Sequence, residues 1–436
     1  MGAADPTVRP AASVPPGPKE KRVHFAWVVL AGICIVMGLA RGGIGNAGGL
    51  FMAPVMAELG CGAGTFMLYF SISSIVTFLF LPVAGRLTVR CDIRLLLIAG
   101  LILQAGAFAL FGTLHSIWGW YILSVPMAVG AVITTQIAGP VLIDSWFKKH
   151  NGLAVGIMMA AVGLFGTVLQ PLTGGLIAGS GWRQAYFVVG GAVLLAGIPA
   201  VLLTIRGAPR DKGLRPLGEG AGPLAAPAVS KQGVTAGTAQ RSPAFWALAL
   251  FMFFITAVSA FAQHFPKYAD QLGFDASFAG TAMGVFMLGL SAGALVLGLL
   301  SDKAGAEATA IFALACGVGA VLVLIFSGAR PLPFLLAVFV FGFSSSAVGT
   351  LGPLLTVALF GQREYGKIYS RAAMGTALAG TAALPGYGFI YDRVNNYIPV
   401  LWAICIMLAL CAVCVFAAFA DKKRQEKTGS WNRWIN

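Results

Sequence analysis

The sequence predicts an all-α, polytopic membrane protein whose twelve transmembrane helices form two pseudo-symmetric six-helix halves. Of its 436 residues, 58% are hydrophobic and only 10% are charged, and the mean hydropathy is +0.85. Soluble domains do not have this composition, whereas helical membrane proteins do. Two further observations support the prediction: the basic residues favour alternate connections, and motifs of the first half recur in the second.

Twelve apolar segments are long enough to cross a bilayer as helices, which takes about 20 residues each. In chain order they are 25–49, 65–85, 93–113, 117–144, 151–178, 184–205, 244–268, 277–300, 307–328, 332–360, 365–391 and 397–420. The first span follows a polar, Pro-rich segment that does not look like a cleavable signal peptide.

Lysine and arginine lie mainly on one side of the predicted bundle. Of 29 such residues, 23 fall on the side that holds both termini, 4 fall on the other side, and Arg41 and Arg371 lie within spans. Basic residues are enriched in cytoplasmic loops. We therefore expect a protein of the cytoplasmic membrane with both termini cytoplasmic. The net charge of +14 then results from the basic residues of the cytoplasmic loops of a protein embedded in membrane lipid, and it does not indicate binding of nucleic acid.

The longest connection is rich in Gly, Pro and Ala and reads as a flexible linker. It divides the chain into a first half and a second half of six spans each. The expected organisation is a cytoplasmic N-terminal segment (1–24), the first half (25–205), a cytoplasmic linker (206–243), the second half (244–420) and a cytoplasmic tail (421–436).

The two halves share a sequence pattern at a nearly constant offset. Three positions of span five recur in span eleven, 214 residues later: Gly166, Pro171 and Gly174 match Gly380, Pro385 and Gly388. Gly85, which ends span two, matches Gly298, which ends span eight, at an offset of 213. Duplicated six-span halves with a site between them near the midplane are a transporter architecture.

Several motifs resemble those of a known family. Residues 298–305 (GLLSDKAG) resemble the loop motif of the major facilitator superfamily, and residues 85–94 (GRLTVRCDIR) resemble a degraded first copy of it. Three further stretches are similar to the branch of monocarboxylate transporters and oxalate–formate antiporters: 26–32 (AWVVLAG), 146–156 (WFKKHNGLAVG) and 385–392 (PGYGFIYD). The resemblance covers about residues 24–420. It implies the major facilitator fold, with spans one, four, seven and ten lining a central cavity.

The loop motifs predict a conformational latch at the cytoplasmic ends of spans two and eight, formed by Gly85, Arg90, Gly298, Asp302 and Lys303. Glycine permits close helix contact, and Asp302 can accept hydrogen bonds at the N-terminus of a neighbouring helix, where the helix dipole favours an anion. Arg90 and Lys303 would add charge contacts that break when this face opens. The alternative is that these charges only set the topology.

Arg41 is the main candidate for binding a solute. An arginine in a transmembrane span is costly and is a functional hypothesis by default. As an α-helix, span one places Arg41 on one face with Cys34, Gly38, Gly45 and Gly48. No Asp or Glu lies in the interior of any span, and Asp144 is at the cytoplasmic end of span four. An anionic solute is therefore favoured, because a guanidinium binds a carboxylate through two parallel hydrogen bonds. The alternative is a structural arginine that contacts backbone carbonyls or snorkels outward.

Arg371 is the second cation within a span. The resemblance implies a functional basic residue in span eleven, which would engage the solute as the cytoplasmic side opens. An arginine so near the span end can instead snorkel to the cytoplasmic surface. Gln136 and Ser345, near the middle of spans four and ten, would orient the solute. Asn46 and Tyr69 complete the candidate set; each of these four is equally suited to an ordinary bond between helices.

His264, near the outer end of span seven, is a candidate for proton coupling because the ordinary pKa of histidine lies near 6.5. The alternative is an interfacial histidine at the outer mouth.

The sequence therefore predicts a secondary transporter, not an enzyme, for a small organic anion such as a mono- or dicarboxylate. Transport would proceed by alternating access, with proton symport or anion exchange. We expect no cofactor and no metal, because the sequence has neither a phosphate-binding loop nor a cluster of metal-ligand residues. The alternatives are an exporter of a neutral or hydrophobic compound and a non-transporting membrane sensor.

Overall fold

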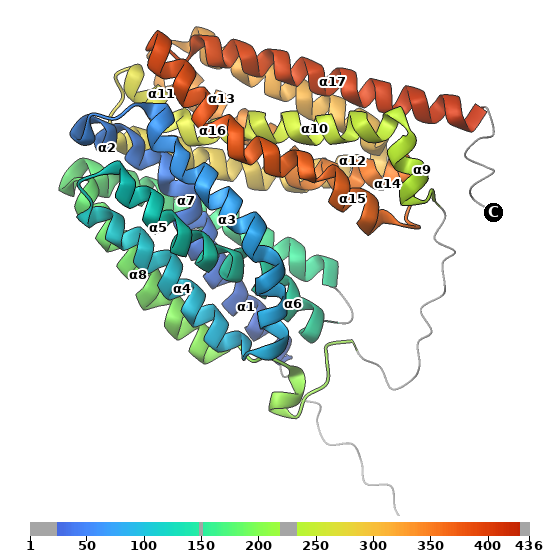
Figure 1. Cartoon of the computed structure of the whole chain (residues 1–436), viewed down its shortest axis with the longest axis horizontal. Coiled ribbons are helices and arrows are strands. Elements are labelled where there is room, and N and C mark those ends of the chain that lie inside the picture. The colour runs from blue at the N-terminus through green and yellow to red at the C-terminus, as the bar shows by residue number, and fades with distance from the viewer. Residues whose placement is uncertain (1–23, 148–150, 219–232, 428–436) are drawn as a thin grey trace, which may run out of the picture.

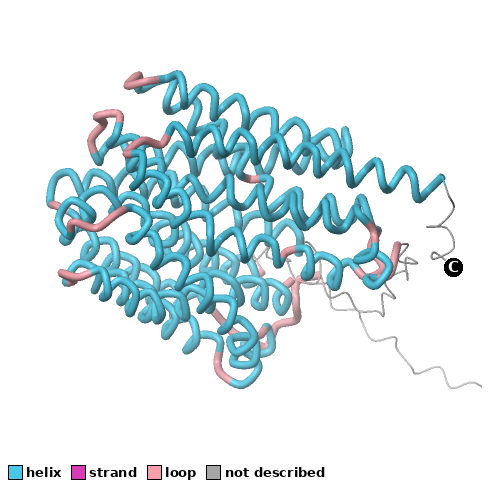
Figure 2. Tube along the Cα trace, turned by 45° about the horizontal axis from the view of Figure 1, so that its top comes forward, coloured by secondary structure: helices cyan, strands magenta, loops and turns pink. Residues whose placement is uncertain are grey.

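A computed structural model describes residues 24–147, 151–218 and 233–427, and these residues are almost entirely helical (Figures 1 and 2). The α-helices are α1 (Phe25–Met37), α2 (Met52–Leu59), α3 (Ala63–Arg90), α4 (Ile93–Leu110), α5 (Ile117–Ala131), α6 (Ala138–Trp146), α7 (Asn151–Ser180), α8 (Trp182–Thr204), α9 (Ala236–Arg241), α10 (Pro243–Ala260), α11 (Phe265–Gln271), α12 (Ala276–Ser327), α13 (Pro331–Ser345), α14 (Ala347–Phe360), α15 (Tyr365–Ala372), α16 (Met374–Val394) and α17 (Ile398–Lys427). Most of the predicted N-terminal segment, the middle of the linker, the end of the tail and residues 148–150 of the span-five motif lie outside the described residues.

The helices account for twelve membrane crossings. Among the described residues, ten helical segments are long and apolar enough to cross a membrane. One of them, α12, has 52 residues and is interrupted at Gly305 (φ 82°, ψ 163°), so it contains predicted spans eight and nine. Predicted span eleven corresponds to α15 and α16, which are not among the ten. The all-α, twelve-helix prediction is confirmed.

The first span is longer than predicted. The sequence analysis ended it at residue 49, but helical structure continues through the π-helix η1 (Gly38–Gly45), the 3-10 turn η2 (Gly48–Phe51) and α2 to Leu59. The predicted end at residue 49 lies in a glycine-rich stretch. In the structure these glycines bring the helix close to its neighbours, so the helix bends and continues.

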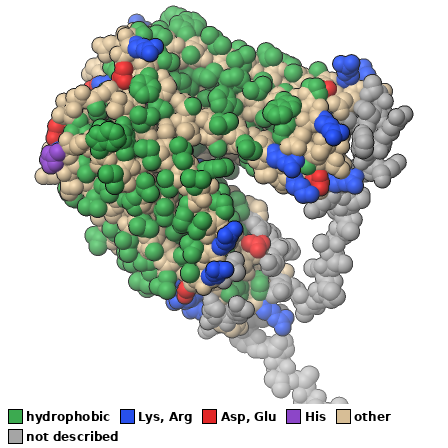
Figure 3. All heavy atoms as spheres, in the orientation of Figure 1, with side chains coloured by type: hydrophobic (Ala, Val, Ile, Leu, Met, Phe, Trp, Pro, Cys, Tyr) green, Lys and Arg blue, Asp and Glu red, His purple; other side chains and the backbone are tan. Residues whose placement is uncertain are grey.

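The two halves form separate groups of helices that meet at one end and diverge at the other (Figure 1). Helices α1–α8 make up the first half and α10–α17 the second. The described parts of the linker lie where the halves diverge, and we call this the linker end and the opposite one the far end. Between the halves the surface is hollowed at the linker end, and Lys and Arg side chains lie on both sides of the opening (Figure 3).

Two helix pairs hold the halves together: α3 with α16, and α7 with α12. Small residues let the backbones approach, and a Cβ placed on Gly174 of α7 would come within 2.5 Å of the Ala276 carbonyl oxygen. At the far end, the Asp392 carboxylate accepts hydrogen bonds from the amides of Ala63 (2.7 Å) and Gly64 (2.9 Å). These contacts close the far end while the linker end is open.

Both ends of the linker make defined contacts, although the composition predicted flexibility throughout. On the first half, the Leu217 amide donates to the Trp146 carbonyl (2.8 Å). On the second half, the Ala236 amide at the start of α9 donates to the Glu364 carboxylate (2.7 Å). The composition of the segment did not show these contacts, because they depend on partners in the helical halves.

Candidate functional site

Arg41 lies on a wide π turn in the first span. The turn η1 packs against α7 through Gly42, whose added Cβ would meet the Val162 carbonyl oxygen and the Gly166 amide. Arg41 and Gly45 are exposed, whereas Gly42 is buried. Helices α4, α7 and α8 of the same half contact this segment, and Arg41 lies on the side that they leave uncovered.

The predicted face of span one is split by this π turn. Gly38 packs against Phe165 of α7, and Gly48 packs against Tyr69 of α3, so neither shares the exposed side with Arg41. A π-helix has a larger number of residues per turn than an α-helix, and it therefore rotates the residues that follow it. The prediction of a single face assumed an uninterrupted α-helix.

The guanidinium of Arg41 has no hydrogen-bond or ion-pair partner in the part of the chain that the structure describes. Each arginine carries five donors, which normally find partners when they lie within a protein. The observed arrangement differs from the structural alternative, in which Arg41 would bond to backbone carbonyls. An exposed, unpaired cation within a transmembrane span is suited to receive an anion.

Gln136 lies on a second π turn, η4 (Val132–Ile137), in the fourth span. Its side chain is exposed, and η4 contacts η1. The structure thus brings the turn that carries Gln136 next to the turn that carries Arg41. π turns occur frequently at functional sites.

The other predicted ligands are placed differently. Asn46 is half-buried, and its Nδ2 donates to the Arg41 carbonyl oxygen (2.8 Å). Tyr69 is buried among aromatic rings, including Phe66 and Phe111. Ser345 is buried, and its hydroxyl has no partner among the described residues. Of the six predicted ligands, only Arg41 and Gln136 therefore combine exposure with adjacent turns.

Arg371 lies near the linker end, in the last turn of α15. Its Nη1 donates to the Gln240 side chain of α9 at 2.6 Å. The structure therefore connects Arg371 to the second end of the linker and does not bring it to Arg41.

His264 is fully buried in the far end of the second half, not at an open mouth. Its Nε2 lies 3.0 Å from the Leu384 carbonyl oxygen, which can only accept, so Nε2 carries the proton. Its Nδ1 lies 2.9 Å from the Tyr397 hydroxyl. Both ring nitrogens are engaged in contacts that fix the ring. The proton-coupling role stays a prediction without a contact to the hollowed surface.

The predicted latch residues are not engaged in this conformation. A Cβ on Gly85 or on Gly298 would meet nothing within 4 Å. Asp302, Lys303 and Arg90 are exposed and make no hydrogen bond or ion pair with any other residue in 24–147, 151–218 or 233–427. A latch that holds the linker end closed would be released when that end is open, so the prediction stands untested.

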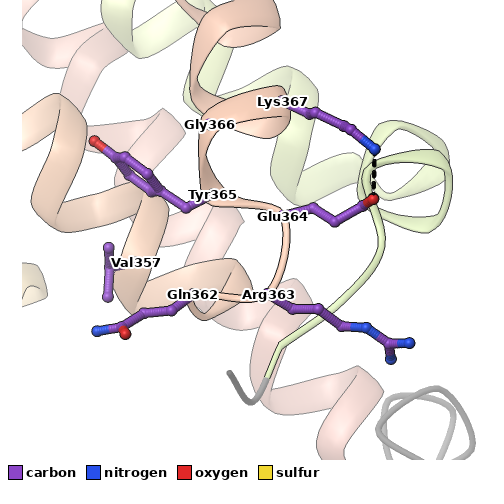
Figure 4. A pocket seen from close by; sticks show the side chains of 7 residues that line it. All are labelled: Val357, Gln362, Arg363, Glu364, Tyr365, Gly366 and Lys367. Carbon is purple, nitrogen blue, oxygen red and sulfur yellow. Dashed lines mark hydrogen bonds and ion pairs between the residues drawn. The ribbon is translucent and has the colours of Figure 1, made fainter. Parts of the chain in front are cut away.

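A separate cavity of about 570 Å³ lies at the linker end of α14 and α15 (Figure 4). Glu364 and Lys367 form an ion pair at 2.7 Å on one side of it, and Tyr365 points the other way. The Ala236 amide and Lys367 stabilise the carboxylate and lower the pKa of Glu364 below its ordinary value. None of the residues lining this cavity belongs to the predicted site.

A family model described as Major Facilitator Superfamily matches residues 33–330 and 265–433. The chain belongs to this superfamily. The Escherichia coli protein "Uncharacterized MFS-type transporter YhjX" is 24% identical over 366 residues, which cover 80% of this chain and 85% of that protein. An "MFS-type transporter" of Gibberella moniliformis is 25% identical over 72% of each chain.

The fold of this major facilitator protein is also that of a solved structure. A bacterial homologue of the human lysosomal transporter Spinster, in an inward-facing and unoccupied conformation, has a TM-score of 0.69. The two chains are 15% identical, and the match covers 92% of this chain and 97% of the other.

Sequence reasoning missed two residues beside Arg41 in this major facilitator protein. Gln104 of α4 and Gln170 of α7 are buried and bond to the carbonyls of η1. Neither glutamine is among the candidate residues that the sequence analysis names. The available signal was an amide inside an otherwise apolar span, since such residues form bonds between helices.

Proposed function

We propose that this protein is a secondary active transporter that moves a small organic anion, a mono- or dicarboxylate, across the cytoplasmic membrane. Membership of the superfamily supports transport by alternating access between the two halves. The observation that carries the choice of an anion is the exposed guanidinium of Arg41, which has no partner among the described residues.

The direction of the opening fits an inward-facing state under this proposal. If the linker is cytoplasmic, as the distribution of basic residues indicates, the hollow at the linker end faces the cytoplasm (Figure 3). Arg41 would then receive the carboxylate from that side, with Gln136 orienting it. Arg371, at the linker end, would attract the anion during entry or release.

Coupling by anion exchange, or by co-movement of a proton with a weak acid, needs no titrating side chain in the span. Both fit a His264 whose ring nitrogens are occupied. The motif resemblance to monocarboxylate transporters and oxalate–formate antiporters supports the same class of solute.

The test is uptake of radiolabelled formate, acetate, lactate, oxalate and succinate into proteoliposomes. Arg41→Gln removes the charge and the paired donors. We expect the uptake rate to fall by roughly 10- to 100-fold, because a hydrogen bond to a charged group contributes about 1.5–3 kcal/mol. Arg41→Lys should give an intermediate rate, because a lysine cannot donate two parallel bonds.

Arg393→Gln is the matched control, because Arg393 is exposed at the far end and makes no hydrogen bond or ion pair with another described residue. Its uptake should equal that of the wild type. Full uptake by Arg41→Gln would reject the proposal. Thermal stabilisation by lipophilic amines or neutral compounds, with none by carboxylates, would favour the exporter instead.

A further inference from the structure

Four consecutive backbone carbonyls around Arg41 each accept a hydrogen bond from an amide side chain. Gln104 Nε2 donates to the Ala40 carbonyl at 2.9 Å, and Asn46 Nδ2 donates to the Arg41 carbonyl at 2.8 Å. Gln170 Nε2 donates to the carbonyls of Gly42 at 2.7 Å and Gly43 at 3.1 Å. These three amides come from α4, from the end of η1 and from α7, and we call them the amide cradle.

The π turn creates the need for these donors. Its backbone bonds do not follow the regular α-helical pattern, and a carbonyl without a partner at membrane depth costs several kcal/mol. Gln104 and Gln170 are only 3% and 0% exposed, so their bonds to the turn are shielded from water. The cradle therefore keeps the distorted backbone satisfied.

The two glutamines differ in how well they are themselves satisfied. Oε1 of Gln104 accepts from the Thr134 hydroxyl of η4 at 2.6 Å, which ties the turn of Arg41 to the turn of Gln136. Oε1 of Gln170 is buried with no partner among the described residues. A buried acceptor without a partner costs about 1–3 kcal/mol, which an apolar side chain would avoid. Gln170 is thus placed for its donors.

The position of the cradle has a consequence for Arg41. The three amides bind the backbone of Arg41 and of its neighbours Ala40, Gly42 and Gly43, so they hold η1 in its π conformation. Gln104 and Gln170 do so from the sides of the turn that pack against α4 and α7, which leaves the Arg41 side chain on the exposed side.

We propose that Asn46, Gln104 and Gln170 are positioning residues, which hold η1 in its π conformation and thereby keep the Arg41 guanidinium on the exposed side, available to an anion. The proposal rests on the proposed function only in the identity of the ligand. The orientation and availability of Arg41 can be tested without a transported solute.

The first test measures Arg41 directly. Phenylglyoxal modifies free guanidinium groups, and peptide mass spectrometry of the full-length protein reports each arginine separately. Gln104→Met and Gln170→Met keep the side-chain length but remove the donors. In these variants η1 should lose its π conformation and turn Arg41 away from its exposed position. We expect its modification rate to fall at least threefold relative to Arg371. An unchanged ratio in both variants would overturn the proposal.

Tyr268→Phe is the control for a merely structural effect. It removes a bond of the same kind, from the buried Tyr268 hydroxyl to the Leu324 carbonyl (2.8 Å), in the second half. It should lower thermal stability by a similar amount to Gln170→Met and leave the modification of Arg41 unchanged. Equal slowing by Tyr268→Phe would assign the effect to general loosening and reject the positioning role.

The second test is a double-mutant cycle on uptake of the panel carboxylate that the wild type takes up fastest. If Gln170 acts through Arg41, Gln170→Met should reduce uptake at least fivefold in the wild type and less than twofold in Arg41→Gln. Additive effects would contradict the proposal. If Arg41→Gln takes up carboxylates normally, the proposed function fails, and the modification experiment still decides the positioning role.

Discussion

The two halves have 3-10 turns at corresponding positions of their first spans, but they carry different side chains at the corresponding positions of the proposed site. The 3-10 turns η2 (Gly48–Phe51) and η6 (Phe261–His264) begin 213 residues apart, and the helices that follow them, α2 and α11, do so as well. At this offset, Arg41 corresponds to Phe254, and Gln136 corresponds to Gly349. At these corresponding positions, the charge and the amide occur only in the first half.

The backbone conformation around Arg41 also differs between the two halves. Span one contains the π turn η1, whereas the corresponding part of span seven is regular α-helix through Ala260. At this offset Asn46 corresponds to Ser259 and Gln104 to Gly317, and at the offset of 214 that relates spans five and eleven Gln170 corresponds to Leu384. The second half therefore lacks all three cradle amides at these positions. The distortion, its supporting donors and the cation occur together in one half. The duplicated fold thus supplies a common frame, and the features proposed for binding lie in the first half.

A second difference lies at the far end, where a helix N-terminus of one half meets the other half. The first amides of α3 bind the Asp392 carboxylate, which belongs to the second half. The corresponding N-terminus of α12 is capped within its own half, by Asp275, which accepts from the Phe278 amide at 2.9 Å. One cap thus joins the halves, and the other does not.

The largest effect is expected from disrupting the close packing of small residues where the halves meet. These two contacts, α7 with α12 and α3 with α16, are called the seams. Gly174→Val places a side chain against backbone atoms of Ala276 and Gly280, which cannot move aside separately. Overpacking costs about 1–3 kcal/mol, so carboxylate uptake should fall roughly tenfold or more. Gly388→Val should do the same at the other seam, because its Cβ would meet the backbone of Ala63 and Gly64.

The neighbouring glycines provide matched controls for these variants. A Cβ on Gly175 or on Gly386 would meet nothing within 4 Å. Gly175→Val and Gly386→Val should therefore retain uptake and thermal stability close to the wild type. If both members of a pair behave alike, close packing at the seam does not limit transport.

The architecture was predictable because it follows from properties of single segments. Apolar length, the side on which basic residues lie and the repeat of Gly166, Pro171 and Gly174 each belong to a short stretch of chain. Arg41 was predictable for the same reason, since a cation in an apolar span is conspicuous by itself.

The rest of the site depends on contacts between distant segments. The π turn of Arg41 is supported by Gln104 and Gln170, which lie 64 and 128 residues away from the carbonyls they bind. Tyr69 and Ser345 are suited to a ligand by residue type, yet both are buried by neighbouring helices. Burial of this kind is a property of the packed bundle, and the sequence pattern did not show it.

The difference between the two caps predicts a smaller, conformational effect. Asp392→Ala removes two hydrogen bonds that exist only while the far end is closed, so it should favour opening there. Cys61 precedes the N-terminus of α3 and is half-buried in this state. We expect its alkylation by a membrane-impermeant maleimide to become several-fold faster, because charge-assisted bonds contribute about 1.5–3 kcal/mol each.

Asp275→Ala is the matched variant for the cap within one half. Loss of such a cap typically costs about 1 kcal/mol of stability. The melting temperature should fall slightly while alkylation of Cys61 stays at the wild-type rate.

Burial and the Asp392 carboxylate both raise the pKa of Cys61, so Asp392→Ala should also shift the pH profile of alkylation downward. An unshifted profile at an unchanged rate would show that Asp392 does not act on this helix end.

The smallest effect is expected at the linker, whose two ends are held by different chemistry. The first end bonds through the Leu217 amide to a backbone carbonyl, which does not titrate. The second end bonds through the Ala236 amide to Glu364, whose pKa is lowered by that bond and by Lys367. A carboxyl with a lowered pKa stabilises the folded contact above its ordinary pKa, and this stabilisation is lost as the pH falls through the lowered value.

We expect hydrogen exchange at Ala236, corrected for its intrinsic rate, to lose protection a few-fold from about pH 7 to about pH 4, while Leu217 keeps its protection. Glu364→Gln should remove the pH dependence and lower the protection of Ala236 at neutral pH. Equal pH dependence at Leu217 and Ala236 would show that both ends of the linker follow the opening of the halves and not the charge of Glu364.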